Sequence, residues 1–286
     1  MMKRLILLSF LVVNIFCPLA GAEDITWIRW DDPPIFVFSG PFKGQGVLDT
    51  VEDELRKKLP QYQHKTLEGT VPRVLKEAES RTHICNAGWL ATPEWSKLFY
   101  FSTPVFVIPA NGILLPKSRL GEVRNLAPYS LQKFLDAKKS WKLGVGRLYG
   151  EGIDEVLTKN NYQKNPQVIT IATSLRVHKM LHANRIQYTL GYPFEAVYYN
   201  ELLNSKADSV VHIPVTENSA RVEVVVACPK TPWGAKVIAD VDRALQNKAL
   251  LEKFEKGVDR WLSAEDQEKL APARKEFYRK NYPSLK

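Results

Sequence analysis

Hydrophobic and polar positions follow two different periods along the chain, and the change between them marks successive strands and helices. Short apolar or alternating runs at 25–30 and 65–67, and one ending at Gly88, predict strands. Between them, apolar residues recur every three or four positions over 47–59 and 71–80, which predicts two amphipathic helices. The order β-α-β-α-β is typical of a parallel sheet with helices on both faces.

A second alternation of strands and helices occupies the middle of the chain. Its strands are predicted at 142–145, 168–171, 187–190 and 210–215, and its helices at 131–138, 153–159, 174–183 and 195–203. The apolar run 105–115, broken by Pro109 and Asn111-Gly112, leads into this unit. The apolar run 222–227 leads out of it, and helices at 232–246 and 249–261 and a charged tail follow.

This order predicts two lobes joined by two connections. Residues 23–115 and 216–286 are expected to form the first lobe, and residues 116–215 the second. Two connections leave a cleft that can close around a ligand. In open α/β sheets, ligands bind beyond the carboxyl ends of the strands, where Gly88 and Trp89 are expected.

The segment from Ile84 to Val105 is predicted to form one wall of a binding site. Trp89 and Trp95 flank the Thr92-Pro93-Glu94 start of a short helix. Backbone N–H groups at a helix start lack partners within the helix and can bind polar groups or anions.

The first residues predict a cleavable export signal. Lys3 and Arg4 precede an apolar stretch from Leu5 to Cys17, and Ala20-Gly21-Ala22 fits a cleavage site. We therefore expect 1–22 to be removed and the protein to reach the periplasm. The apolar stretch is too short to span a bilayer, and Phe16 is too bulky for the residue before a lipid-anchored cysteine.

Composition narrows the function classes. The formal net charge of +9 becomes +7 without the two basic residues of the signal. The sequence has no basic block interleaved with aromatic residues, which argues against nucleic-acid binding.

Cys85 and Cys228 remain after cleavage. An oxidising compartment favours a disulfide between them, with two buried free thiols as the alternative.

The chain resembles the family 3 periplasmic solute-binding proteins, which have the type II binding fold. The matching residues are the signal, Pro34-Ile35-Phe36, Gly46 to Asp49, Gly88 with Thr92-Pro93-Glu94, Phe101-Ser102-Thr103-Pro104, the strand and glycine-rich loop at 142–150, and Met180 to Ile186. The resemblance implies a two-lobed α/β protein whose lobes are mainly parallel sheets flanked by helices. It also implies a monomer without cofactor that captures a small solute for an ABC-type permease or a sensor.

Departures from the family pattern concern the ligand. Amino-acid binders of this family hold the ligand carboxylate with a Thr and an Arg, whose places here are taken by Leu90 and Trp95. Tyr192 stands where the family has an acidic residue that binds the ligand ammonium. Arg29 stands near the end of the first strand, where the family often has an acidic residue. The resemblance therefore implies a small polar solute, anionic or aromatic, rather than an amino acid held in the usual way.

Candidate ligand-binding residues have two kinds of chemistry, and each has a structural alternative. Trp30, Trp89, Leu90, Thr92 and Trp95 are expected to form a wall, or else to pack as core. Polar and charged candidates are Arg29, Arg73, Arg147, Tyr149, Tyr192 and Glu195, whose alternatives are surface ion pairs and a helix start.

Other chemistries have weaker signals. His178 and His182 have a metal-compatible spacing but no third ligand, and the glycine-rich loop 146–152 lacks nucleotide-binding spacing. No nucleophile-elbow motif is present. A dehydratase-like enzyme using Glu195, Arg147 or Arg29 and a sensing module without transport are the rival hypotheses.

Overall fold

The protein is described by a computed structural model. It describes residues 23–70, 72–73, 76–77, 83–146, 149–205, 209–218 and 221–285. The predicted signal 1–22 and most of the helix predicted at 71–80 lie outside these residues. None of the described helices is long and apolar enough to cross a membrane.

The first sheet is built from strands of both ends of the chain. Its order is β2-β1-β3-β11-β4, and β5 pairs with the remaining length of β11. The strands are β1 (Asp24–Arg29), β2 (Gln63–Glu68), β3 (Ile84–Trp89), β4 (Phe99–Phe101), β5 (Phe106–Pro109) and β11 (Arg221–Pro229). β1 is parallel to β2 and β3, whereas β11 is antiparallel to β3, β4 and β5.

The second sheet has the order β10-β6-β9-β7-β8. Its strands are β6 (Gly112–Pro116), β7 (Leu143–Val145), β8 (Val168–Thr170), β9 (Tyr188–Gly191) and β10 (Val210–Ile213). β7 is parallel to β8 and β9, and β6 is antiparallel to β9 and β10. Both sheets are mixed rather than mainly parallel, because the strands that connect the lobes run antiparallel to their neighbours.

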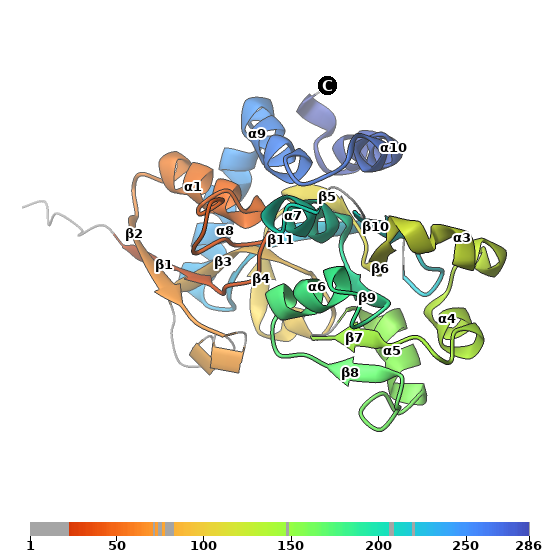
Figure 1. Cartoon of the computed structure of the whole chain (residues 1–286). Helices are drawn as coiled ribbons and strands as arrows, with labels where there is room; N and C mark the ends of the chain where they lie inside the picture. The colour runs from red at the N-terminus through yellow and green to blue at the C-terminus, as the bar shows by residue number, and fades with distance from the viewer. Residues whose placement is uncertain are drawn as a thin grey trace, which may run out of the picture.

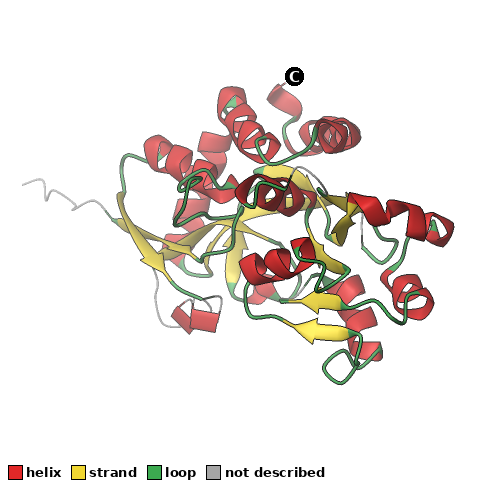
Figure 2. Ribbon diagram, viewed as in Figure 1, coloured by secondary structure: helices red, strands yellow, loops and turns green. Residues whose placement is uncertain are grey.

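Helices surround the two sheets (Figures 1 and 2). The α-helices are α1 (Val47–Lys58), α3 (Leu120–Val123), α4 (Leu131–Ala137), α5 (Glu151–Lys159), α6 (Ser174–His182), α7 (Pro193–Leu202), α8 (Pro232–Leu245), α9 (Lys248–Asp259) and α10 (Ala264–Asn281). Short 3₁₀ turns are η1 (Trp95–Lys97), η2 (Lys117–Arg119), η3 (Arg124–Leu126) and η4 (Pro283–Leu285). The predicted charged tail is thus largely helix, with Leu270 and Phe277 buried against the first core.

Two short connections join the sheets. Ala110 and Asn111 lie between β5 and β6, and residues 214–220 separate β10 from β11. β6 pairs within the second sheet, although 112–115 were expected in the first lobe. We propose that the chain passes from one lobe to the other at these two connections.

Helix α7 packs against both lobes. It follows β9 of the second sheet, and Asn200 bonds to the backbone of Val210 in β10. On the other side, the Tyr198 ring lies 5.6 Å from that of Phe42 and 5.0 Å from that of Trp261. The helix therefore lies between the two sheets (Figure 1). Phe194, Tyr198 and Tyr199 belong to the first core, whereas Ala196 packs in a cluster with Leu114 and Val210 of the second sheet.

The predicted disulfide is confirmed, and the apolar run 35–38 forms no strand. Cys85 of β3 is bonded to Cys228 of β11, its neighbour in the sheet. The run 35–38 forms only an isolated bridge between Asp32 and Phe36. The Pro33-Pro34 turn, in which the Ile35 N–H donates to Asp32 O at 2.8 Å, ends the extended chain there.

Candidate functional site

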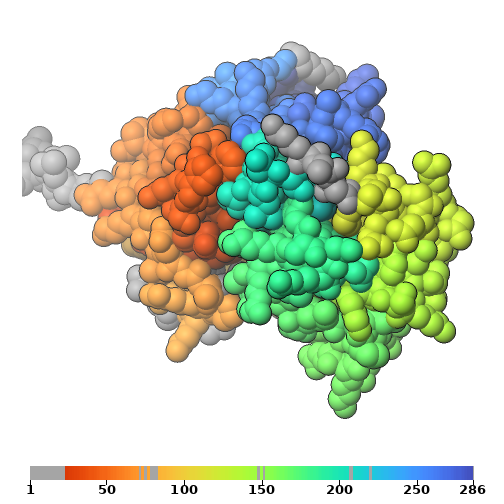
Figure 3. Space-filling model, in the orientation of Figure 1, coloured from red at the N-terminus to blue at the C-terminus, as the bar shows by residue number. Residues whose placement is uncertain are grey.

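A cavity of about 330 Å³ lies at the carboxyl ends of β1 and β3 and is lined by both lobes. Its lining residues are Trp30, Asp32, Ile35, Val47, Leu48, Gly88, Trp89, Leu90, Trp95, Phe106, Ile108, Tyr192, Phe194 and Val224. The space-filling view shows the N-terminal residues of the first lobe in contact with the green and teal residues of the second (Figure 3). The position agrees with the rule that ligands of α/β sheets bind beyond the carboxyl ends of strands.

Three tryptophans form the wall of the first lobe. Trp89 meets Trp30 at 5.8 Å between ring centroids and an interplanar angle of 88°. It meets Trp95 at 5.5 Å and 85°. Such edge-to-face pairs stabilise one another beyond their buried area, so the wall is pre-arranged.

Gly88 allows α1 to approach this wall closely. A Cβ at this position would lie 2.6 Å from Leu48 Cδ1, which is closer than side chains pack. Leu48 itself lines the cavity. The glycine therefore makes room for α1, rather than for the ligand alone.

The second lobe contributes two aromatic rings. Tyr192 and Phe194, at the start of α7, are stacked at 4.7 Å with an interplanar angle of 21°. Glu195 follows them but does not line the cavity: its Oε1 accepts the Tyr192 N–H at 2.8 Å, which caps α7. This hydrogen bond agrees with the interpretation of Glu195 as a helix-start residue, and it occupies one of the two carboxylate oxygens.

Asp32 is the charged residue among the described lining residues. Its Oδ1 accepts a hydrogen bond at 3.1 Å from the hydroxyl of Ser174, the first residue of α6 in the second lobe. The contact joins the two lobes at the edge of the cavity. Asp32 is not among the ligand-binding candidates predicted from the sequence.

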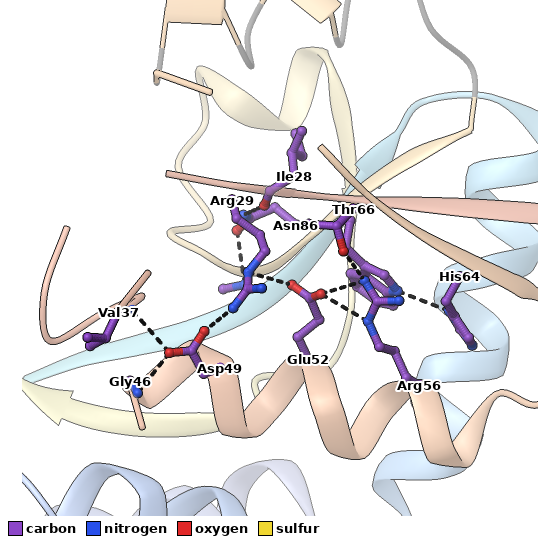
Figure 4. A network of polar contacts seen from close by, with 12 residues as sticks. Ile28, Arg29, Val37, Gly46, Asp49, Glu52, Arg56, His64, Thr66 and Asn86 are labelled. Atoms are coloured by element: carbon purple, nitrogen blue, oxygen red, sulfur yellow. Dashed lines mark hydrogen bonds and ion pairs between the residues drawn. The ribbon is translucent and has the colours of Figure 1, made fainter. Parts of the chain in front are cut away.

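Arg29, expected either to bind an anion or to form an ion pair, is not among the lining residues and forms ion pairs. Its guanidinium pairs with Asp49, and its Nε lies 3.5 Å from Glu52 Oε2 (Figure 4). Both carboxylates come from α1 and are buried, at 1% and 2% side-chain exposure. Removing one partner of a buried pair leaves an uncompensated charge, so this arginine is committed to the fold.

The same network fixes the loop that carries one wall of the cavity. Asp49 Oδ2 accepts the backbone N–H groups of Val37 at 3.0 Å and Gly46 at 2.8 Å (Figure 4). Burial raises the pKa of Glu52, and hydrogen bonds and charge from Arg56 and Arg29 oppose that rise. The network positions the loop before α1, which includes Ile35 of the cavity.

Two other candidates do not line the cavity, and a third lies outside the described residues. Arg73 is exposed, with its Nε 4.0 Å from Glu77 Oε1. Thr92 is exposed, and its Oγ1 accepts the N–H of Trp95, the first residue of η1, at 3.3 Å. Arg147 lies outside the described residues.

A small polar niche in the second lobe adjoins the cavity. It is lined by Gly146, Tyr149, Ser174, Val177, His178, Thr189, Leu190 and Glu195, and its volume is about 10 Å³. Tyr149 is buried, and its hydroxyl accepts the Gly146 N–H at 2.9 Å. Ser174 of the niche wall donates a hydrogen bond to Asp32 of the cavity wall, so this contact links the two walls.

The histidines of α6 have separate surroundings. His178 is buried, stacks on Tyr199 at 3.8 Å and has its Nε2 3.8 Å from Glu195 Oε2. His182 Nδ1 is 2.9 Å from Ser205 Oγ. Within the described residues, no group of three His, Cys, Asp or Glu side chains could hold a metal ion.

Several lining residues were not predicted from the sequence: Asp32, Ile35, Val47, Leu48, Phe106, Ile108, Phe194 and Val224. Most are apolar residues of strands and helices, which the pattern assigns to the core. Position relative to the strand ends is the signal that could have found Asp32, because it follows β1 by three residues, as Leu90 directly follows β3.

No profile of a known protein family and no curated protein sequence matches the chain. Solved structures do match it. The probable amino-acid ABC transporter extracellular-binding protein YtmK from Bacillus subtilis is 16% identical, with a TM-score of 0.61 over 84% of this chain and 99% of its own. The periplasmic VFT2 domain of BvgS from Bordetella pertussis is 12% identical, with a TM-score of 0.57 over 84% and 92%.

A third match is the ancestral amino-acid-binding protein AncCDT-1, a precursor of cyclohexadienyl dehydratase. It is 16% identical, with a TM-score of 0.60 over 85% of this chain and 96% of its own. At these identities the likeness shows the fold. The chain has the two-lobed α/β fold of the periplasmic solute-binding proteins, which confirms the fold that the resemblance predicted.

Proposed function

We propose that this protein captures a small solute with a flat, apolar body between its two lobes and releases it to an inner-membrane permease or a sensor. The observation that carries the proposal is the tryptophan-walled cavity at the strand ends, which Tyr192 and Phe194 face from the other lobe. A cavity of about 330 Å³ matches the lower end of small-molecule sites.

The proposed mechanism is closure of the cleft. The ligand touches Trp30, Trp89 and Trp95 of the first lobe and Tyr192 and Phe194 of the second only when the lobes are together. Its differential affinity for that arrangement shifts the equilibrium toward it. The Asp32–Ser174 hydrogen bond supports the same arrangement.

The lining favours an aromatic solute over an anionic one. The described lining residues include six aromatic side chains (Trp30, Trp89, Trp95, Phe106, Tyr192 and Phe194) and no Lys or Arg. Arg29, the arginine nearest this wall in sequence, is paired with Asp49 and Glu52. Aromatic rings recognise flat apolar bodies by offset stacking and edge contacts.

The test is a thermal-shift screen of the mature protein with small aromatic solutes, followed by calorimetry and chromatographic analysis of each compound that stabilises it. Stabilisation with the compound recovered unchanged is expected, because a ligand that binds only the folded state raises the melting temperature. Trp89→Ala should weaken binding by about tenfold or more, because the variant loses the apolar area that the indole buries against the ligand, together with an aromatic contact worth about 0.5–1.5 kcal/mol beyond that area.

Tyr100→Ala is the matched control. Tyr100 is also an aromatic residue of the first lobe, but it is exposed and does not line the cavity. Equal losses in both variants would contradict the proposal, and so would a screen in which no aromatic solute stabilises the protein. Appearance of a converted product would favour the dehydratase-like alternative.

We also propose that the protein is a periplasmic monomer that binds its solute without converting it and without a cofactor. It takes support from the transporter-associated and sensor-associated binding proteins that share the fold. AncCDT-1 shows the same fold in the ancestry of an enzyme, which is why the product analysis is part of the test.

A further inference from the structure

We propose that the second lobe adsorbs to an anionic phospholipid surface through a basic patch at its end remote from the cavity. The patch consists of Arg119, Lys138, Lys139, Lys142 and Arg185. The inference goes beyond solute capture, because none of these residues lines the cavity.

The positive charge of the chain is concentrated in the segment 116–215, which contains β7, β8, β9 and β10 of the second sheet. This segment has 14 Lys and Arg residues against 8 Asp and Glu residues. The rest of the chain after residue 22 has 24 against 23 and is almost balanced. The second lobe therefore carries most of the net positive charge, and its field attracts anionic surfaces.

Contacts around Trp141 bring two of the cations together. The guanidinium carbon of Arg119 and the Nζ of Lys138 each lie 5.1 Å from the centroid of the Trp141 ring. The indole attracts both charges, which offsets part of their mutual repulsion. Trp141 is itself buried, at 7% exposure, so it holds the two cations beside each other at the surface.

Lys142 and Arg185 extend the patch to the place where β7 and β9 begin. The backbone N–H of Lys142 donates to Gln187 Oε1 at 2.7 Å. Arg119 Nη2 donates to Asn184 Oδ1 at 2.8 Å, and Arg185 is the next residue of the chain. Residues from three segments of the second lobe therefore meet in one basic surface.

Strand direction places the patch away from the cavity. β7 and β9 are parallel, and Tyr192, which lines the cavity, directly follows the carboxyl end of β9. Lys142 and Gln187 directly precede β7 and β9 at the opposite end of the sheet. Contact with a membrane through the patch therefore leaves the lining of the cavity uncovered.

Carboxylates neutralise little of this charge. Glu122 pairs with Arg119, with 3.2 Å between Oε1 and Nη1. Asp136 of α4 accepts a hydrogen bond from Gln132 at 3.0 Å. Within the part of the chain that the structure describes, no acidic side chain lies within ion-pair distance of the four other cations of the patch.

The patch lacks the apolar anchors of a protein interface. The core of such an interface is rich in aromatic and other apolar side chains. None of the large apolar residues that the structure shows to be exposed belongs to the patch; they are Leu90, Leu98, Tyr100 and Leu175. Adsorption to anionic headgroups needs charge alone, and each Lys or Arg near the membrane strengthens it about fivefold. The chemistry of the patch thus favours lipid headgroups over an acidic protein.

Sedimentation of the mature protein with vesicles tests the inference. Vesicles of phosphatidylcholine with an equal share of phosphatidylglycerol should bind it more than about tenfold more tightly than vesicles of phosphatidylcholine alone, because several cations contribute. Binding should weaken strongly between about 0.1 M and about 1 M salt, since the Debye length falls from about 10 Å to about 3 Å.

Lys139→Gln/Arg185→Gln removes two exposed charges of the patch. It should weaken binding to the mixed vesicles about twentyfold, from about fivefold for each residue. Lys275→Gln/Arg279→Gln is the matched control, because it removes one Lys and one Arg from exposed positions of α10 in the first lobe. The control should bind nearly as tightly as the unsubstituted protein, and melting temperatures show whether both variants are folded.

Several outcomes would overturn the inference. They are equal binding to both kinds of vesicle, binding to neither, and a loss in the control as large as that in the patch variant. Binding to polyglutamate without binding to the mixed vesicles would assign the patch to an acidic protein and would overturn the inference too. These outcomes leave aromatic solute capture untouched, because the solute screen uses protein without lipid.

Discussion

At the scale of single residues, burial sets the charge of His212. Its Nε2 is enclosed on β10 without a hydrogen-bond partner among the described residues. Burial lowers the pKa of this imidazole to about 4, against a partial opposing effect of the Glu195 charge and a small lowering by Lys269. His212 is therefore neutral in the folded protein at physiological pH.

This neutrality makes part of the stability depend on pH. The unfolded chain binds a proton at His212 near pH 6.5, whereas the folded protein does so only near pH 4. The stability contributed by the neutral side chain is thus complete above about pH 6.5 and is lost as the pH falls toward 4. Between pH 7 and pH 5 we expect a loss of about 2 kcal/mol in the free energy of unfolding from this residue.

Urea unfolding of the mature protein and of His212→Gln at the two pH values measures the effect. The variant lacks the titrating group. Between pH 7 and pH 5, its free energy of unfolding should therefore fall by about 2 kcal/mol less than that of the unsubstituted protein. Parallel pH dependences in the two proteins would show that His212 does not titrate as described.

The choice between functional and structural interpretations of a residue is also made at this scale. Trp30, Trp89, Leu90, Trp95 and Tyr192, which line the cavity, were all predicted from the sequence. The tryptophans were identified as aromatic residues near predicted strand ends and a helix start, and Leu90 and Tyr192 by their positions in the family resemblance. The sequence could not separate Arg29 from a ligand-binding arginine. Which side of the wall a strand residue occupies depends on α1, whose Asp49 and Glu52 hold that guanidinium.

At the scale of elements, β6 and β10 approach each other at a glycine. A Cβ on Gly112 would lie 2.5 Å from His212 Nε2 and would overlap the carbonyl oxygen of Ile213. The carbonyl belongs to the backbone and cannot move away as a side-chain end does. Gly112 thus lets the strand begin directly after the connection between the lobes.

Gly112→Ala should lower the free energy of unfolding by about 1–3 kcal/mol, the usual effect of overpacking. Gly121→Ala is the matched control, because a Cβ there meets no atom within 4 Å and the residue is in helix α3. Alanine favours helices over glycine by up to about 1 kcal/mol, so the control should be neutral or slightly stabilised. Thermal melts compare the two variants, and equal stability would contradict the packing argument.

The elements themselves were largely predictable. Helix α1 ends near Pro60 and α6 begins at the cap Thr173, and both follow from local signals in the chain. The failures were non-local. The short run after Pro33-Pro34 has strand composition but no neighbouring strand to pair with, and the direction of β11 beside β3 cannot be read from either segment alone.

At the scale of the whole molecule, the Cys85–Cys228 disulfide ties the two ends of the first lobe together. The cysteines are 143 residues apart, and the intervening chain includes the second lobe. A disulfide that closes so long a loop lowers the entropy of the unfolded chain, which in the chain-entropy description stabilises the folded protein by up to about 5 kcal/mol. Other effects reduce the stabilisation measured for many disulfides to about 2–5 kcal/mol.

The double variant Cys85→Ala/Cys228→Ala should therefore lose about 2–5 kcal/mol in urea unfolding and keep its fold. Wild-type protein under strong reductant should lose a similar amount, and the reductant should not affect the variant. An unchanged unfolding midpoint in the variant would contradict the stabilising role.

The position of α7 between the lobes bears on how fast a solute can enter and leave. Phe194 and Tyr198 are 2% and 3% exposed, and an opening in which α7 moves with the second sheet would bring both into water. Exposing such rings is unfavourable in proportion to their area, so the open form is expected to be scarce even without solute. Association that waits for a scarce form proceeds below the usual range of about 10⁵–10⁷ M⁻¹s⁻¹, and release is delayed by the same barrier. A captured solute would then stay bound for long periods unless a partner separates α7 from Phe42 and Trp261.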